Sequence, residues 1–305
     1  MKFKSAIPEI KDALIEIGEA VPLVLPHFNA VQSKYYNLIK YYGGKYYQLE
    51  NTLPFIRKVA MFNQAETYVE CFGGGGKCLL NTDKMSYTFN KKIYNEYDKG
   101  ICCLFEVASN NKTAKKLVDF LSNQKVNKEL FDFCKQHRND KDNSKFESAY
   151  MTFVLCSTSY NGAMGSYVER DEETFYRAVE RINYAPEHLA NTKIINGDYK
   201  VLLQKYGKDK KTVLYLDPPY HPACRNQSAL NVYSNELSRE QHKEMVNLLC
   251  CSRGWVLSGY DPAQYGCDDY VALEESGAIK VSIGKYNILA SKNELSKEEF
   301  IWYKF

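Results

Sequence analysis

Hydrophobic residues recur at two different spacings along the first hundred positions of the chain. Apolar positions three or four residues apart over residues 6–20 predict an amphipathic helix. Continuous apolar and β-branched runs predict strands over residues 67–72 and 93–98, with four glycines and then a helix through Leu79 between them. Another apolar helix is expected from Ile101. This strand–loop–helix–strand order predicts a parallel βαβ unit.

The pattern changes in the middle of the chain. Residues 105–186 contain stretches rich in lysine and asparagine, and helical spacing replaces the strand pattern there. A Ser-x-x-Gln capping box at Ser238 predicts the start of a later helix. Further strands are predicted over residues 193–195, 213–216, 255–257, 279–281 and 299–303. The expected organisation is an N-terminal helical extension (1–33), an α/β domain built from two segments (34–104 and 187–305), and an inserted helical subdomain (105–186).

Composition narrows the class of protein without identifying a function. A chain of 305 residues can bury a large core without disulfides or metal. Its formal net charge of +3 permits a nucleic-acid partner, but binding would require a local basic face. The ten cysteines show no Cys/His spacing typical of a zinc site, so we expect reduced, mostly buried thiols and no metal. No apolar stretch is long enough to cross a bilayer, and we expect a cytoplasmic protein without a membrane partner.

The most informative motif is the tetrapeptide Asp217-Pro218-Pro219-Tyr220, which follows the apolar run of residues 212–216. The carboxylate of Asp217 can accept a hydrogen bond, and Pro218 has no N–H and offers only its carbonyl. Pro219 restricts the backbone before it, and Tyr220 presents a flat aromatic face. Two acceptors beside a stacking ring suit a site that holds a planar heterocycle by its exocyclic amino group. The alternative is an ordinary turn, because Asp-Pro is common in turns.

Three other motifs also stand where a predicted strand ends. Gly73 to Gly76 follow the first strand and allow a ligand to approach the backbone closely. Glu96 ends the second strand, where a carboxylate can bind ribose hydroxyls, and residues 196–199 end the third. Ligands of parallel α/β sheets bind beyond the carboxyl ends of the strands, so we expect these motifs to line one crevice. A flexible glycine loop and a simple Asn-Gly turn are the alternatives.

In chain order these motifs resemble those of the Dam-like DNA N6-adenine methyltransferases. Residues 40–45 (KYYGGK) are similar to that family's N-terminal cofactor motif, and residues 69–75 (VECFGGG) are similar to its V-E-P-F-x-G-x-G loop, with Cys71 in place of the proline. Residues 95–98 resemble the ribose motif, residues 196–199 the G-D-[FY] motif, and residues 217–220 the catalytic D-P-P-Y motif. The resemblance implies a Rossmann-like S-adenosylmethionine-dependent methyltransferase sheet of the α/β class, with a mainly helical target-recognition insertion.

The same resemblance implies the roles of individual residues. The S-adenosylmethionine contacts would be Tyr41, Gly43, Gly44, Lys45, Glu70, Phe72, Gly73, Gly75, Glu96, Asp198, Tyr199 and Asp217. Catalysis would rest on Asp217, Pro218, Pro219 and Tyr220. The implied reaction moves a methyl group to N6 of an adenine flipped out of double-stranded DNA. Flipping costs a few kcal/mol, and stacking on Tyr220 could return about 1–3 kcal/mol. We expect a monomer, associated with the nucleoid of a prokaryotic or phage-infected cell.

DNA recognition is expected in the inserted subdomain. Members of the family carry a hairpin around an N-G-x-x-R-x-N sequence, whereas this chain has Met164 where the arginine is often found and a shortened hairpin before Arg170. The recognition sequence therefore cannot be predicted from that position. The candidate DNA contacts are Asn161, Lys112, Lys115, Lys116 and Arg170. A solvated helical face is the alternative interpretation of the lysines. His221 is interpreted as local structure rather than a general base.

Two other functions compete with adenine methylation in DNA. The first is methyl transfer to another amino group, on cytosine N4, on adenine in RNA or on a protein glutamine. Relatives with those substrates more often carry S-P-P-Y or N-P-P-Y, so the acid of Asp217 favours adenine. The second is a catalytically dead DNA-binding relative, which would be expected to have lost part of the site. The lysine, the glycine loop, the ribose acid and the D-P-P-Y motif are all present, and we therefore expect an active enzyme.

Overall fold

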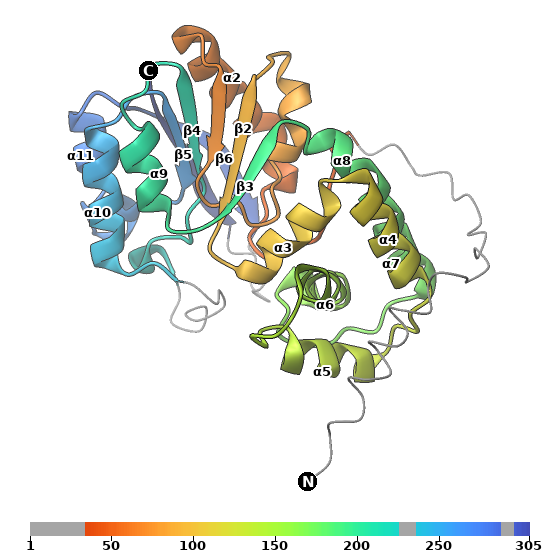
Figure 1. Cartoon of the computed structure of the whole chain (residues 1–305). Coiled ribbons are helices and arrows are strands. Elements are labelled where there is room, and N and C mark those ends of the chain that lie inside the picture. The colour runs from red at the N-terminus through yellow and green to blue at the C-terminus, as the bar shows by residue number, and fades with distance from the viewer. Residues whose placement is uncertain (1–33, 226–235, 288–295) are drawn as a thin grey trace. The chain divides into compact units, whose positions relative to one another are not determined.

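Within the described residues, seven strands form one sheet in the order β3-β2-β1-β4-β5-β7-β6 (Figure 1). The strands are β1 (Thr67–Glu70), β2 (Lys91–Glu96), β3 (Thr192–Asn196), β4 (Thr212–Leu216), β5 (Trp255–Gly259), β6 (Ile279–Asn287) and β7 (Ser296–Lys304). The computed structural model describes residues 34–225, 236–287 and 296–305. The helix expected over residues 6–20 lies outside the described residues.

The sheet is parallel from β3 to β5. Strand β1 pairs in parallel with both β2 and β4, and Glu70 lies beside Tyr94 on one neighbour and Tyr215 on the other. Strand β7 runs antiparallel between β5 and β6. The chain leaves β1 toward β2 and later returns to its other side with β4, so the sheet has its topological switch point between β1 and β4. This arrangement confirms the expected Rossmann-like α/β fold, and β1 and β2 are parallel as expected.

Apolar residues on both faces of the sheet explain why the central strands form. Every residue of β4 is buried, and because successive side chains alternate between faces, Leu214 and Leu216 belong to one core cluster. That cluster also contains Trp255 and Trp302 together with residues of α9 (Tyr199–Tyr206), α10 (Arg239–Cys250) and α11 (Val271–Glu275). Helix α2 (Leu49–Asn63) contributes nothing to this cluster but packs against β4 and β5, which places it on the opposite face. The sheet is therefore covered on both sides.

The middle of the chain is helical, as expected. It contains α3 (Lys99–Ala108), α4 (Asn111–Ser122), α5 (Lys128–His137), α6 (Lys145–Thr158), α7 (Glu172–Glu180) and α8 (Ala185–His188). Residues 148–156 of α6 are all buried, and α6 packs against α3 and α5; Figure 1 shows it end-on between them. Because α3 packs on both α6 and β3, it connects the helices to the sheet. The division into a catalytic domain and an insertion at residues 105–186 stays a prediction.

Short 3₁₀ helices and loops connect these elements. Within the described residues, the 3₁₀ helices are Tyr46–Gln48, Leu79–Met85, Tyr160–Gly162, Arg181–Tyr184, Pro222–Cys224 and Pro262–Tyr265. The helix expected through Leu79 is present as a kinked 3₁₀ helix, so the predicted βαβ unit has no α-helix between β1 and β2. Its kink lies at Asn81, whose side-chain amide bonds the backbone of Tyr36 and Lys77. The side chain thus ties the segment to a distant part of the chain.

The capping box at Ser238 and the chemistry of the cysteines agree with expectation. The hydroxyl of Ser238 accepts from the backbone N–H of Gln241, and the Gln241 amide oxygen accepts from the backbone N–H of Ser238. All ten cysteines are free thiols, and most of them are buried. Among the described residues, no helix has both the length and the apolar character needed to cross a membrane.

Candidate active site

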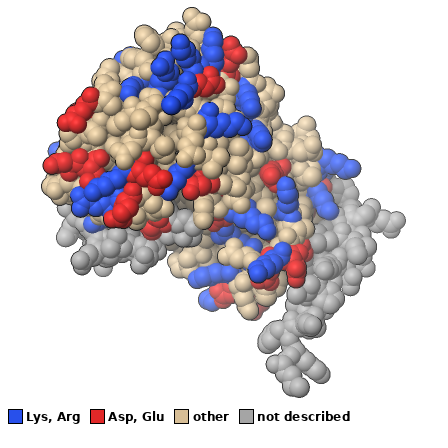
Figure 2. Space-filling model, turned by 60° about the vertical axis from the view of Figure 1, so that its left-hand side comes forward, with Lys and Arg blue, Asp and Glu red and all other residues tan. Residues whose placement is uncertain are grey.

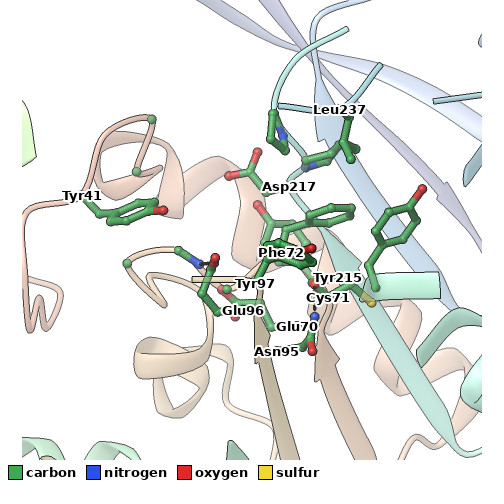
Figure 3. Close-up of a pocket in the computed structure, with 18 of the residues that line it drawn as sticks. Tyr41, Glu70, Cys71, Phe72, Asn95, Glu96, Tyr97, Tyr215, Asp217 and Leu237 are labelled. Atoms are coloured by element: carbon green, nitrogen blue, oxygen red, sulfur yellow. Dashed lines mark hydrogen bonds between the residues drawn. The ribbon is translucent and has the colours of Figure 1, made fainter. Parts of the chain in front are cut away.

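Every residue that the sequence predicts for catalysis or cofactor binding lines one pocket (Figure 3). The pocket has a volume of about 290 Å³, near the lower end of small-molecule sites. It lies beyond the carboxyl ends of β1, β2 and β4, at the switch point of the sheet. In the view of Figure 3, Tyr41 stands apart from Phe72 and Leu237, with Glu96 and Asp217 between them. The sequence motifs therefore converge as expected, while the role of each residue stays a prediction.

The glycine loop is held in place rather than loose. The N–H of Gly73 donates to the carbonyl of Asn95 at 2.7 Å, and the N–H of Gly74 donates to Glu96 Oε2 at 2.7 Å. A Cβ at Gly73 would lie 2.2 Å from the ring of Tyr94, so no larger residue fits there. Gly74 has a φ of +48°, a left-handed backbone conformation that residues with a side chain rarely adopt. These contacts speak against the alternative of a freely flexible loop.

Glu96 ends β2 and connects the two loops beside it. One of its carboxylate oxygens accepts from Gly74, and the other accepts from the N–H of Asp98 at 2.9 Å. Burial raises the pKa of Glu96, although backbone N–H donors, first those of Asp98 and Gly74, oppose the shift. A carboxylate offers about four lone-pair sites, so it can accept from further donors. Tyr97 follows it, is 64% exposed and lines the same pocket, which places an aromatic ring beside the acid.

A buried ion cluster lies behind the Asp-Pro-Pro-Tyr motif. Lys45 is only 4% exposed, and its Nζ lies 3.3 Å from Asp217 Oδ1. The same Nζ bonds Glu299 Oε1 and the hydroxyl of Tyr220. The hydroxyl of Tyr220 in turn donates to Glu299 Oε1 at 2.8 Å. Lys45 is thus compensated by two carboxylates, and the ring of Tyr220 is fixed by its hydroxyl.

Burial and charge act in opposite directions within this cluster. Burial raises the pKa of Asp217 to about 6, although the charge of Lys45 opposes the shift. For Lys45, burial favours the neutral amine, but the charges of Asp217 and Glu299 outweigh it and raise its pKa above the ordinary value. The hydroxyl of Ser258 also donates to Asp217 Oδ1 at 3.4 Å. Above about pH 6 the site therefore presents an ionised Asp217, a hydrogen-bond acceptor, to the pocket.

Glu70 has a structural task in addition to lining the pocket. Its Oε2 accepts from the hydroxyl of Tyr68 and from the N–H of Leu79, both at 2.7 Å. Burial raises the pKa of this carboxyl to about 8, with these two donors opposing the rise. Glu70 thereby ties the end of β1 to the segment after the glycine loop. The predicted cofactor contact by Glu70 stays a prediction.

His221, directly after the motif, is held by local contacts. The N–H of Ala223 donates to its Nδ1 at 3.2 Å, so Nε2 carries the proton and donates to Asp269 at 3.1 Å. His221, Cys267 and Asp269 are the group of described residues whose donor atoms lie close enough to hold a metal ion. However, Arg239 already donates to both oxygens of Asp269, at 2.6 and 3.0 Å. These contacts support the interpretation of His221 as local structure.

The sequence reasoning missed several residues of the site. Glu299, on β7, has its carboxylate in the ion cluster although it is 251 residues from its partner Gln48 and 254 from Lys45. The sequence contains a signal for Glu299, because an acid within an apolar strand is expected to be buried and therefore to need a charged or hydrogen-bonding partner. Tyr97 could have been found by its position after Glu96 at a strand end. Lys77, Leu237 and Gln241 also line the pocket, and no local pattern marked them.

The candidate DNA contacts do not line the pocket. Lys112, Lys115 and Lys116 lie on α4, where Lys115 pairs with Asp119 at 3.1 Å and Lys116 lies over the ring of Phe146. Asn161 lies in a 3₁₀ turn with a φ of +50°. Arg170 donates to the carbonyl of Ser159 at 3.3 Å. The five residues therefore fall into two groups, one on α4 and one at the loop that follows α6.

That loop is the shortened hairpin expected from the sequence. A single antiparallel bridge joins Ser159 to Tyr167, and Met164 at its tip has a φ of +57°. Arg138, from the end of α5, donates to the sulfur of Met164 at 3.2 Å and also pairs with Asp98. Met164 is therefore packed against a guanidinium from another helix.

Comparison with known proteins gives one match. A family model described as D12 class N6 adenine-specific DNA methyltransferase matches residues 41–250, more than half of the chain. The match begins at Tyr41, contains the glycine loop, the inserted helices and the Asp-Pro-Pro-Tyr motif, and ends with α10. A search of curated proteins finds no match.

Proposed function

Since the chain belongs to the D12 class N6 adenine-specific DNA methyltransferase family, whose activity is adenine methylation in DNA, we propose that its pocket holds S-adenosylmethionine and the target adenine side by side. Asp217, Pro218 and Tyr220 receive the adenine. The glycine loop and Glu96 receive the cofactor. The observation that carries this assignment is that the carboxylate of Asp217 and the glycine loop line the same pocket.

The residues on the cofactor side fit the proposed ligand. Gly73 and Gly74 add no side chains to the loop, so a ligand can approach its backbone closely. Glu96 keeps lone pairs for two ribose hydroxyls, and Tyr97 and Phe72 offer aromatic faces to a purine. When bound, the cofactor supplies an electrophilic methyl group. Tyr41, from the segment before α2, covers the loop with its ring near Gly74.

The residues on the adenine side provide two acceptors and a stacking surface. Adenine N6 is a poor nucleophile because its lone pair is delocalised into the ring. If the carboxylate of Asp217 and the carbonyl of Pro218 accept its two N–H groups, the lone pair is freed and the positive charge that develops on N6 is stabilised. Pro219 holds the carbonyl of Pro218 in place by restricting the backbone. Tyr220 offers its ring to the base, and Lys45 and Glu299 hold its hydroxyl.

The inserted helices are the proposed DNA-recognition subdomain, over residues 105–186. We also propose double-stranded DNA as the substrate, with the adenine flipped out of the helix, because a target atom inside a duplex cannot reach a pocket of this kind. A monomer suffices for this chemistry, since residues of one chain line the whole pocket. A cytoplasmic, nucleoid-associated enzyme follows from a DNA substrate.

Labelled methyl transfer tests this proposal. The intact protein should move tritiated methyl groups from S-adenosylmethionine into unmethylated DNA, and digestion of the product should give N6-methyladenine. RNA, cytosine-only DNA and unlabelled protein substrates serve as the competing acceptors. Label in RNA with none in DNA of varied sequence would contradict the proposal, as would label recovered as N4-methylcytosine.

A further inference from the structure

Three positively charged side chains gather beside the pocket without a carboxylate partner. They are Lys40, Arg170 and Arg181. Lys40 directly precedes the pocket residue Tyr41, Arg170 follows the shortened hairpin, and Arg181 begins the 3₁₀ helix Arg181–Tyr184. Burial and then the positive charges of Arg170 and Arg181 lower the pKa of Lys40. Burial also lowers the pKa of Arg181, and the nearby hydroxyls of Tyr36 and Tyr46 oppose this shift. Such a group of like charges is unfavourable unless an anion joins it.

Several other cations of the inserted helices are paired with a carboxylate. Lys115 pairs with Asp119, Lys128 with Asp132 and Arg177 with Glu173, each one helical turn away. Figure 2 shows the same mixing of basic and acidic side chains over the face that it draws. In the described part of the chain, no salt bridge reaches Lys40, Arg170 or Arg181, and the buried Nε atoms of both arginines have no hydrogen-bond partner. Their charge is therefore available to a ligand.

Hydrogen bonds and packing fix the segments that carry the three residues. Arg170 is anchored to the carbonyl of Ser159 at 3.3 Å, and the carbonyl of Arg181 accepts from the hydroxyl of Tyr36 at 2.7 Å. Gly162 lies against the backbone of Lys40, so closely that a Cβ there would be 2.4 Å from the Lys40 carbonyl oxygen. The hairpin therefore packs directly on the segment that leads to Tyr41. The hairpin and the segment before Tyr41 thus hold Arg170 and Lys40 on neighbouring parts of the backbone.

The position of the cluster indicates which anion it would bind. Lys40 is the residue before Tyr41, which lines the pocket, and the charge of Arg181 also reaches the pocket residue Lys77. None of Lys40, Arg170 and Arg181 lines the pocket itself, so the carboxylate of a bound cofactor is not the favoured partner. A duplex whose adenine enters the pocket must bring its backbone phosphates to the surface around it.

We propose that Lys40, Arg170 and Arg181 form a binding site for DNA backbone phosphate beside the base that enters the pocket. The proposal rests on the proposed function in taking DNA as the substrate. It replaces the face of α4 as the main phosphate contact and retains Arg170 from the residues suggested by the sequence. Phosphate contacts of this kind carry no base specificity, but they fix the position of the duplex on the protein.

Salt dependence of DNA binding tests the proposal. Each phosphate contact contributes about 0.9 to the slope of log K against log salt concentration. We expect Lys40→Met and Arg170→Met each to lower that slope by about 0.9, and to weaken binding equally for DNA of different sequences. Binding of a short labelled duplex can be followed by fluorescence anisotropy over a series of salt concentrations. Lys205→Met, which removes one exposed lysine on α9, is the matched control and should leave the slope unchanged.

Three further measurements make the outcome decisive. Thermal unfolding checks that each variant is folded, and Lys40→Met carries the test if Arg170→Met is unstable, because Lys40 is exposed whereas Arg170 is partly buried. Slopes equal to that of Lys205→Met would overturn the proposal. Weaker binding of S-adenosylhomocysteine by Lys40→Met, with an unchanged slope, would overturn it too and identify the cofactor carboxylate as the anion. Methyl transfer by the unmodified protein into the same duplex is measured in parallel, since its absence would count against the proposed function and not against the phosphate site.

Discussion

Charged side chains are buried at the carboxyl edge of the sheet and exposed on the inserted helix α4. At the sheet edge, Lys45 and Glu299 are almost fully buried and Asp217 is partly buried, and they compensate one another in a fixed arrangement. On α4, Lys115 is exposed and pairs with Asp119 one turn away. Removing one member of a buried pair leaves an unpaired charge, whereas exposed pairs contribute little to stability. Single substitutions should therefore have large effects at the sheet edge and small effects on the helices.

The largest effect on stability is expected from Glu299→Gln. The substitution keeps the shape of the side chain but removes a charge that compensates Lys45. The free energy of unfolding should fall by about 3–5 kcal/mol, the usual cost of breaking a buried pair. Glu298→Gln is the matched control, because Glu298 precedes it on β7 and its bonds to Ser282 and Gln264 are at the exposed surface. Urea unfolding of both variants gives the comparison, and equal losses would contradict the assigned role of Glu299.

A smaller effect is expected from Gly73→Ala. The added Cβ would meet the ring of Tyr94 at 2.2 Å, and overpacking of this kind costs about 1–3 kcal/mol. The displaced loop should also weaken the binding of S-adenosylhomocysteine, measured by calorimetry. Gly165→Ala, in the shortened hairpin, is the control from the other region. A Cβ there has its nearest neighbour at 3.9 Å, so stability should change by less than about 0.5 kcal/mol. Unchanged cofactor binding in Gly73→Ala would argue against the glycine loop as the cofactor site.

The pH dependence of the reaction reports the charge of Asp217. Burial raises its pKa to about 6, so the carboxylate is ionised above that pH and protonated below it. The ionised form stabilises the positive charge that develops on N6, whereas the protonated form has lost that negative charge. We therefore expect kcat/KM to be constant above the pKa and to fall about tenfold for each pH unit below it. The fall should reverse when the pH is restored. A constant kcat/KM down to about pH 5 would mean that ionised Asp217 is not required.

The smallest effect is expected from Lys115→Met on α4. Loss of its pair with Asp119 should cost about 0.3–0.5 kcal/mol of stability. Because this charge is already compensated, the salt dependence of DNA binding should not change, unlike that of Lys40→Met. A slope lowered by about 0.9 would restore α4 as a phosphate-binding face.

The sequence predicted the parts of the site that local patterns specify. Apolar runs located β1, β2 and β4, and the motifs at their ends identified the glycine loop, Glu96 and Asp217. Parallel strands then brought these motifs together without further information, because their carboxyl ends share one edge. The capping box at Ser238 is likewise a pattern of neighbouring residues, and the structure contains it.

Local sequence patterns do not predict contacts between segments that are far apart in the chain. Lys45 meets Tyr220 across 175 positions and Glu299 across 254. The partnership of Asn81 with Tyr36, which accompanies the kink in the 3₁₀ segment, is also non-local. The cluster of Lys40, Arg170 and Arg181 exists only because the hairpin packs on the segment before Tyr41. A single sequence does not reveal which surfaces meet in this way.

The most direct test of the central claim compares the unmodified protein with Asp217→Asn in one experiment. Transfer of a labelled methyl group to adenine N6 of an unmethylated duplex is measured together with the binding of S-adenosylhomocysteine. The asparagine keeps one acceptor oxygen but lacks the negative charge, and this loss should lower kcat by a factor of about 10² to 10³, while cofactor binding stays within a few-fold of the original. Asp142→Asn, in the exposed loop before α6, should behave like the unmodified protein. Undiminished methyl transfer by Asp217→Asn would contradict the role of the Asp217 charge in stabilising N6.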